Sequence, residues 1–222
     1  MSYMTDVLAI LSAFASGDAW EIRNAMRSDA VWILGFVITI LGGWAIAMLY
    51  KRVPLLDKHL ERSIMVVSYL GIALIIFWGV VDRFVFSNQQ PWSTTIPPLL
   101  FMVMAWFGAT YNVRLRSHLN FSEFRSRMGR NSQFMCLCLD NVLWMGFAII
   151  VMVTTSRATA LSASNFQIVL GTDNTMQWWF LILAPLAFLL MAARVVENFL
   201  EDLQNYRSGN ELIKASVLGG GE

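Results

Sequence analysis

The 222-residue sequence is 57% hydrophobic and only 14% charged, with a mean hydropathy of +0.56. A typical soluble domain carries about 25% charged residues, so the composition excludes a soluble enzyme and indicates a membrane protein. The net charge of +1 offers no basic excess for nucleic acid, and two cysteines, Cys136 and Cys138, suffice neither for a disulfide framework nor for a four-cysteine zinc site.

Residues 1–29 contain one short apolar run, VLAILSAFA, with no basic residue ahead of Arg23. A secretory signal peptide requires a positively charged segment before its apolar run, so that interpretation is disfavoured. An amphipathic helix lying at the membrane interface is predicted instead, with Thr5 or Asp6 as its N-terminal cap.

Five later stretches are apolar over the length of about 20 residues that a helix needs to cross a bilayer. The polar segment SNQQPWSTT separates the second stretch from the third, and Pro97 and Pro98 are predicted in the first turn of the third helix, capped by Thr94 or Thr95. The fold class is therefore an all-α polytopic helical bundle with a membrane domain over residues 30–203, and residues 204–222 are predicted to form a flexible cytoplasmic tail. The five spans cover approximately residues 30–50, 63–86, 96–115, 134–155 and 176–198.

The basic residues are distributed unequally between the two sides of this bundle. The segments after the first, third and fifth spans hold twelve Lys and Arg residues, and the opposite segments hold four. Basic loops stay in the cytoplasm, so the C-terminus is predicted inside and the N-terminus outside. An alternative topology has four spans, with residues 30–50 lying flat at the interface. It also places the basic segment 51–62 inside, so the charge count does not distinguish the two topologies. Tryptophans sit near the predicted outer ends, at Trp32, Trp92, Trp178 and Trp179.

The sequence shows no pattern typical of catalysis or of cofactor binding. Both histidines, His59 and His118, fall in predicted loops, so a haem ligated within the bundle is not expected, and Cys136 and Cys138 are interpreted as packing residues. Ionisable groups inside spans usually mark function, but here they fall near helix ends, and Asp140 is the one carboxylate that is a candidate for a deep position. We therefore expect no enzyme, no metal site and no cofactor in this chain. The other ionisable groups of the spans are Asp82, Arg83, Arg194 and Glu197.

A series of short motifs runs from Ser63 to about Leu203: V-D-R-F-V-F, Pro91-Trp92-Ser93, Trp106-Phe107-Gly108-Ala109, Arg114, Arg116, His118, Trp178-Trp179, Pro185 and Met191-Ala192-Ala193-Arg194 through Glu197. The order of these motifs resembles the DctQ-type small membrane subunit of tripartite ATP-independent periplasmic (TRAP) transporters. The sequence departs from the family pattern at Thr94-Thr95, where an acidic pair is usual, and at Ser122, where an Asp is frequent. The first span also lies outside the usual four-helix pattern.

The resemblance implies a non-catalytic scaffold subunit in a bacterial inner membrane. In such a transporter, a large membrane subunit carries the substrate and sodium sites and moves as an elevator, while a periplasmic binding protein delivers organic acids. Phospholipids are further expected partners, because the basic inner rim attracts anionic headgroups. The alternatives are an accessory or anchor subunit of another membrane complex and a stand-alone membrane enzyme or channel. The candidate partner or lipid interface comprises Arg83, Trp92, Gly108, Arg114, Arg116, His118, Trp178, Trp179, Arg194 and Glu197.

Overall fold

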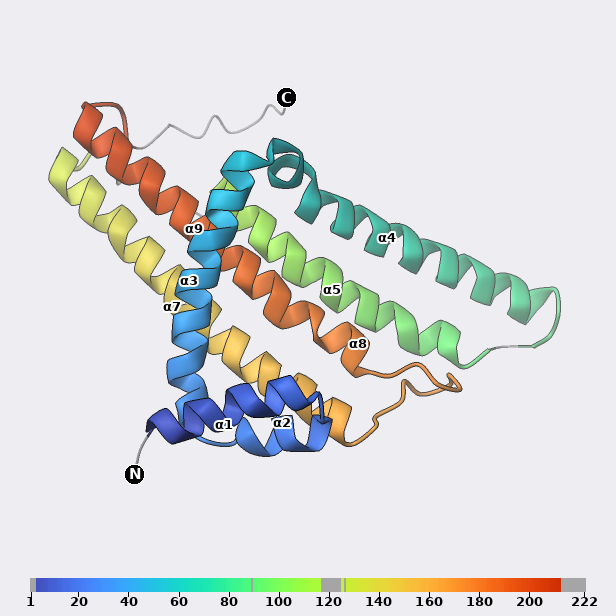
Figure 1. The fold of residues 1–222 in the computed structure, drawn as a ribbon. Coiled ribbons are helices and arrows are strands. Elements are labelled where there is room, and N and C mark those ends of the chain that lie inside the picture. The colour runs from blue at the N-terminus through green and yellow to red at the C-terminus, as the bar shows by residue number, and fades with distance from the viewer. Residues whose placement is uncertain (1–2, 89, 117–124, 126, 213–222) are drawn as a thin grey trace.

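The computed structural model describes residues 3–88, 90–116, 125 and 127–212, and these residues form an almost entirely helical protein (Figure 1). Five helical segments in them are long and apolar enough to cross a membrane, which confirms the predicted all-α polytopic fold. The helices are α1 (Tyr3–Ser16), α2 (Ala19–Ala25), α3 (Ala30–Arg52), α4 (Pro54–Phe84), α5 (Trp92–Leu115), α7 (Arg130–Ser164), α8 (Trp178–Leu181) and α9 (Leu183–Ser208).

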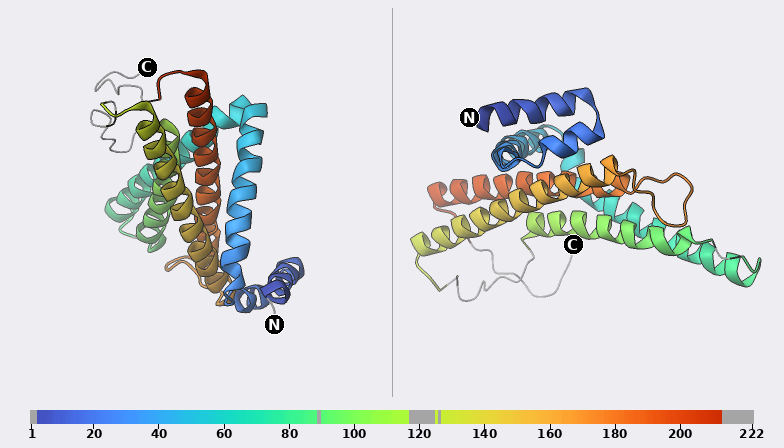
Figure 2. Two further views of the ribbon diagram at one scale, coloured as in Figure 1. Left: turned by 90° about the vertical axis from the view of Figure 1, so that its left-hand side faces the viewer. Right: turned by 90° about the horizontal axis from the view of Figure 1, so that it is seen from below.

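Four long helices form a row in the order α4, α5, α9, α7, and α3 crosses this row over α9 and α7 (Figure 1). The short helices α1 and α2 lie on the same side of the row as α3 (Figure 2). The helix α9 is the centre of the bundle, with 44% of its most apolar window buried, against 6% for α4 at the end of the row. The fold is therefore wide, and α4 leaves most of its apolar surface uncovered.

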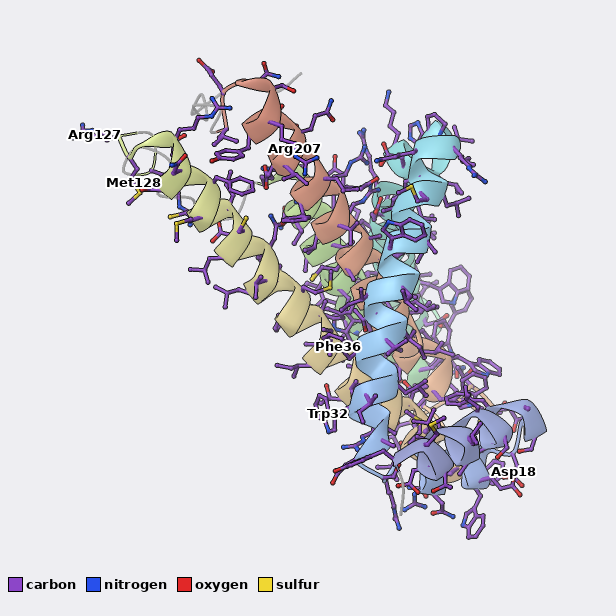
Figure 3. The ribbon with its side chains drawn as sticks, turned by 60° about the vertical axis from the view of Figure 1, so that its left-hand side comes forward. Asp18, Trp32, Phe36, Arg127, Met128 and Arg207 are labelled. Atoms are coloured by element: carbon purple, nitrogen blue, oxygen red, sulfur yellow. The ribbon has the colours of Figure 1, made fainter. Side chains whose placement is uncertain are left out.

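A stripe of small residues lets α3 approach its neighbours closely. The buried positions Gly35, Thr39, Gly43 and Ala47 recur every four residues and so share one face of the helix. A Cβ atom added to Gly43 would come within 3.1 Å of the Ala192 backbone on α9. Trp32 and Phe36, labelled on α3 in Figure 3, are partly exposed. This packing along the bundle favours the five-span prediction over a first helix lying flat.

The prediction that residues 51–62 form a loop is wrong. The helix α4 begins at Pro54, one residue after α3 ends at Arg52, so most of the basic segment forms the first turns of a 31-residue helix. Proline is favoured at the first position of a helix because its missing N–H needs no partner there. The helix start therefore precedes the apolar window by about two turns, which places Asp57 and Glu61 on a regular helix.

The start of α5 is also earlier than predicted. The helix begins at Trp92, so Pro97 and Pro98 lie inside it, and neither Thr94 nor Thr95 acts as its cap. The Ser93 hydroxyl donates a 2.7 Å hydrogen bond to the Gln90 carbonyl, which supports this earlier start. The two prolines remove two hydrogen bonds of the helix interior.

Three further boundaries differ from the predictions. The helix α1 begins at Tyr3, so Thr5 and Asp6 lie in its first turn rather than at its cap. The helix α7 extends well beyond the predicted 134–155 span, and α9 continues to Ser208 before Gly209 ends it with a φ of 79°, so the first part of the predicted tail is helical. Pro185 accounts for the break at Ile182 between α8 and α9, because its ring excludes a regular bond to residue 181.

The segments that the basic-residue count assigns to one side of the membrane also lie at one end of the bundle. Arg127 and Arg207 lie at one end, and Asp18, at the start of α2, lies at the other (Figure 3). The junction of α3 with α4 and the end of α5 lie at the end that carries Arg207 (Figure 1). The alternation of the five spans therefore agrees with the grouping that the charges predict.

Candidate functional site

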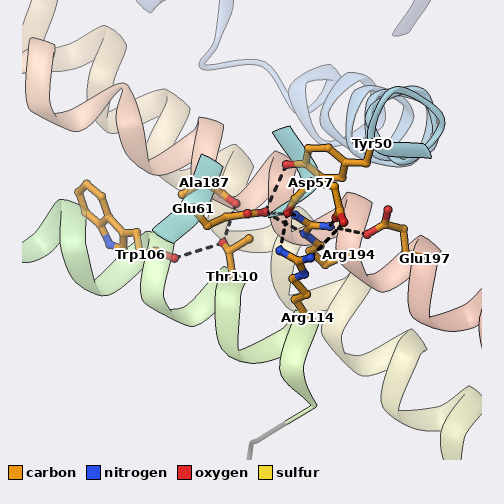
Figure 4. Close-up of polar contacts among 9 residues, drawn as sticks. All are labelled: Tyr50, Asp57, Glu61, Trp106, Thr110, Arg114, Ala187, Arg194 and Glu197. Carbon is orange, nitrogen blue, oxygen red and sulfur yellow. Dashed lines mark hydrogen bonds and ion pairs between the residues drawn. The ribbon is translucent and has the colours of Figure 1, made fainter. Parts of the chain in front are cut away.

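Arg194 is the centre of a buried charged cluster that joins four helices (Figure 4). Its side chain is 1% exposed, although it carries a full charge in the middle of α9. The guanidinium donates to Glu61 Oε1 at 2.8 Å from Nε and to Glu197 Oε2 at 2.7 Å from Nη1, and it also pairs with the Asp57 carboxylate. The Tyr50 ring of α3 lies 4.0 Å from the guanidinium carbon, in a cation–π contact.

The acidic half of the cluster comes from the first turns of α4. Asp57 and Glu61 are four residues apart, so both carboxylates face α9. The Asp57 carboxylate also accepts a 3.0 Å bond from Nη2 of Arg114, so it bridges two arginines from different helices. Glu61 is 0% exposed and accepts a 3.3 Å hydrogen bond from the Tyr50 hydroxyl, while its Oε2 atom has no partner among the described residues.

These contacts fix how the helices align rather than opening a path through them. Two guanidinium groups and three carboxyl groups meet within one cluster, and every contact joins groups of this chain. Beside it, the buried Thr110 hydroxyl donates 2.9 Å to the Ala187 carbonyl and so links α5 to α9 (Figure 4). Removing one partner of a buried ion pair costs about 3–5 kcal/mol, so the cluster strongly favours this one alignment.

A second set of polar contacts lies closer to the ends of α5, α7 and α9. Arg116 ends α5 in the left-handed conformation, with a φ of 52°, and its Nη1 lies 2.6 Å from the buried Asp202 carboxylate. Asn141 of α7 donates to the other oxygen of Asp202 at 3.1 Å. Arg130, at the start of α7, donates to the carbonyls of Asn205 and Tyr206 in the last turn of α9, where cations are favourable. One end of the bundle is therefore held together by charge.

Asp57 and Glu61 were not predicted as site residues, because residues 51–62 were assigned to a loop, and Tyr50 was not predicted either. A signal was present: a proline followed by two carboxylates spaced four residues apart is typical of a helix start with one acidic face. Arg194 and Glu197 are three residues apart on α9, a spacing that favours pairing, and they form an ion pair.

Asp140, the candidate for a deep position, is partly exposed and paired with Arg125. Its carboxylate accepts a 3.0 Å bond from Nη2 of Arg125, and its side chain is 32% exposed. This hydrogen bond raises the pKa of Arg125 above its usual value. The deeply buried carboxylates among the described residues are those of Glu61 and Asp202, and neither was predicted.

The structure divides the predicted interface residues between the two ends. Arg114, Arg194 and Glu197 belong to the buried charged cluster and Arg116 to the second set, and all four form ion pairs within the chain. Trp92, Trp178, Trp179 and Arg83 belong to the opposite end, with Trp179 51% exposed. A Cβ on Gly108 would make an ordinary 3.6 Å contact with Met65. His118 lies outside the described residues.

The loop before α8 packs against the start of α5 at this opposite end. Gly171 adopts a φ of +80°, and a Cβ added there would lie 2.5 Å from Pro91 Cβ, so the close contact requires glycine. The Thr95 hydroxyl donates 2.7 Å to the Leu170 carbonyl. The Pro-Trp-Ser segment is thereby held against a loop about 75 residues further along the chain.

Comparison with known families matches residues 72–205, more than half of the chain, to "Tripartite ATP-independent periplasmic transporters, DctQ component". The chain belongs to the DctQ family. The matched DctQ region comprises the later part of α4 together with α5, α7 and α8, and it includes α9 as far as Asn205. Comparison with curated proteins gives no match.

The DctQ match divides the charged cluster. Arg114, Arg194 and Glu197 lie inside the matched region, whereas Tyr50, Asp57 and Glu61 precede it. The helices α1, α2 and α3 also precede it. The charged cluster therefore connects the DctQ region to the part of this chain that comes before it.

Proposed function

We propose that this chain is a non-catalytic scaffold subunit that supports the large membrane subunit of a TRAP transporter. The observation that carries the proposal is the charged cluster: the ionisable groups buried among the helices are paired with one another and gathered at one end. A transport pathway would need polar groups that converge on a substrate at mid-depth. Charges used to fix helix alignment suit a rigid support.

The proposed complex imports organic acids in a bacterial inner membrane with a sodium gradient. The large subunit carries the substrate and sodium sites and moves against this scaffold, and a periplasmic binding protein supplies the substrate. The bundle end with Trp92 and Trp178 faces the periplasm, and the end with the charged cluster faces the cytoplasm, in agreement with the basic-residue count.

The helix α4 offers the surface that suits a membrane partner best. It packs on α5, with a smaller contact to α3, and leaves an apolar face uncovered along its length. Hydrophobic side chains on this face are 48–69% exposed in the isolated chain. A large membrane subunit packed there would extend the row of helices. The face comprises Val66, Val67, Leu70, Leu74, Phe77 and Trp78.

The experiment is to tag this chain in its native host and purify it in mild detergent. We expect a larger membrane protein of about twelve helices to co-purify, and sodium-dependent uptake of an organic acid to be lost when this chain is deleted and restored by the wild-type gene. Replacing Leu74 with arginine is expected to abolish co-purification, whereas an arginine at the exposed Leu55 is not, and the further change Phe77→Arg is expected to have the same effect as Leu74→Arg. Sodium-driven transport by the purified chain alone in liposomes would overturn the proposal.

A further inference from the structure

Three arginines line one cavity at the end of the bundle opposite the charged cluster. The cavity has a volume of about 380 Å³, and its wall comprises Arg23 and Arg27 from the α2 region, Arg157 from α7, and the apolar residues Met26 and Leu161. Across the described parts of the chain, no carboxylate forms an ion pair with any of the three arginines. The described residues of the cavity wall therefore include three cationic side chains and no carboxylate.

One of these guanidinium groups has an unused donor. Arg23 donates from Nη1 to the Asn165 side chain at 3.2 Å, but its Nε atom is buried and has no partner among the described residues. A buried N–H without an acceptor costs about 1–3 kcal/mol. An acceptor supplied by a bound anion would remove this cost.

Arg157 prepares the cavity for an anion. Its Nε donates 2.9 Å to the Met26 carbonyl and its Nη2 donates 3.0 Å to the Ser28 carbonyl, and its guanidinium lies 5.7 Å from the Trp32 ring. The carbonyl oxygens at the end of a helix carry partial negative charge that would repel an anion. Arg157 covers these carbonyls at the end of α2, so the cavity keeps its positive potential.

An apolar cavity adjoins the basic one. It has a volume of about 290 Å³ and shares the Met26 side chain with the first cavity. The α1–α2 hairpin covers it on one side, and α7, α8 and α9 form the other side. Its apolar wall includes Phe14, Ile22, Ala160, Ala163, Trp178 and Pro185.

We propose that the two cavities together bind one anionic phospholipid, with its phosphate between Arg23, Arg27 and Arg157 and an acyl chain in the apolar cavity. Guanidinium groups bind phosphate oxygens through paired charge-assisted hydrogen bonds. A free phosphate would bind the arginines but would leave the adjoining apolar cavity empty, whereas a phospholipid would occupy both cavities. The site lies between α1–α2, which precede the region matched to DctQ, and α7, α8 and α9 within that region. The proposal does not depend on the proposed transport role.

The test measures lipid binding by the purified full-length chain, with native mass spectrometry of detergent-solubilised protein titrated with phosphatidylglycerol or phosphatidylcholine. We expect the wild type to bind phosphatidylglycerol preferentially and the double variant Arg23→Gln, Arg27→Gln to bind it at least about tenfold more weakly. Arg157 is left intact because it also holds the end of α2. The control is Arg83→Gln, which removes an exposed arginine at the same end of the bundle and is expected to bind normally.

A second arm separates the lipid tail from the phosphate. Ala163→Phe fills the apolar cavity and is expected to weaken phosphatidylglycerol binding, while Ala105→Phe, on an exposed face of α5, is expected to leave it unchanged. Glycerol 3-phosphate, which lacks the acyl chains, is expected to bind far more weakly than the lipid. Equal lipid binding by the double arginine variant and the wild type would overturn the proposal, and so would glycerol 3-phosphate binding as tightly as the lipid. Assembly with a large subunit is not measured, so failure here leaves the proposed function unaffected.

Discussion

The two ends of this bundle use arginine in opposite ways. At one end, Arg194 is 1% exposed and meets carboxylates from α4 and α9. At the other end, Arg23, Arg27 and Arg157 share a cavity, and within the described residues they have no acidic partner. Burial of an unpaired charge costs several kcal/mol. The arginine that is completely buried is therefore paired with carboxylates, whereas the arginines without an acidic partner line an open cavity. Paired arginines therefore serve the fold, and unpaired ones are available to a ligand.

The largest expected effect is at the paired end. Arg194→Met keeps the length of the side chain but leaves the buried Glu61 without its cation and Asp57 with Arg114 alone. We therefore expect the free energy of unfolding in detergent to fall by about 3–5 kcal/mol. Thermal unfolding followed by circular dichroism measures this change. Adding Glu61→Gln to the variant is expected to recover part of the loss. A stability within 1 kcal/mol of the wild type would show that the cluster does not hold the helices together.

The next effect concerns α3, which connects the two ends. Gly43→Leu is expected to destabilise the protein by about 1–3 kcal/mol, because a Cβ there already meets the Ala192 backbone at 3.1 Å. Gly146→Leu on α7 is the matched control, since a Cβ there has no neighbour within 4 Å. The same unfolding measurement compares the two variants. Equal stabilities would contradict the close crossing of α3 over α9.

A smaller effect is expected at the half-exposed ion pair of the same end. Asp140→Asn removes the charge that pairs with Arg125, but the two side chains are 32% and 21% exposed, so the expected loss is below about 1 kcal/mol. The measurement is again thermal unfolding, with Arg194→Met as the reference. If Asp140→Asn lowers the free energy of unfolding as much as Arg194→Met does, burial does not determine how strongly these ion pairs stabilise the protein.

The smallest effect is expected at the unpaired end. The double variant Arg23→Gln, Arg27→Gln breaks no ion pair among the described residues, so in lipid-free detergent its stability is expected to stay within about 0.5 kcal/mol of the wild type. Added phosphatidylglycerol is expected to raise the unfolding temperature of the wild type and not that of the variant. A large loss of stability without lipid would assign these arginines to the fold instead.

Much of the fold was predictable because apolar length and charge are local properties of the chain. The five windows matched five helical segments, and the family resemblance rested on short motifs such as Pro91-Trp92-Ser93 and Trp178-Trp179. Helix ends were predicted less well, because Pro54 and Trp92 begin helices within polar sequence that an apolar window does not include. The charged cluster was missed for the same reason.

The sequence by itself determined that this protein is a helical membrane protein of the DctQ type, because hydropathy, charge and short motifs are read along the chain. Only the tertiary structure decided which arginines are paired. Arg194 and Glu61 are 133 residues apart, and the Met26 carbonyl lies 131 residues from Arg157. Such contacts depend on how α3, α4, α7 and α9 cross, and the small residues that set this crossing exert their effect only when the helices meet.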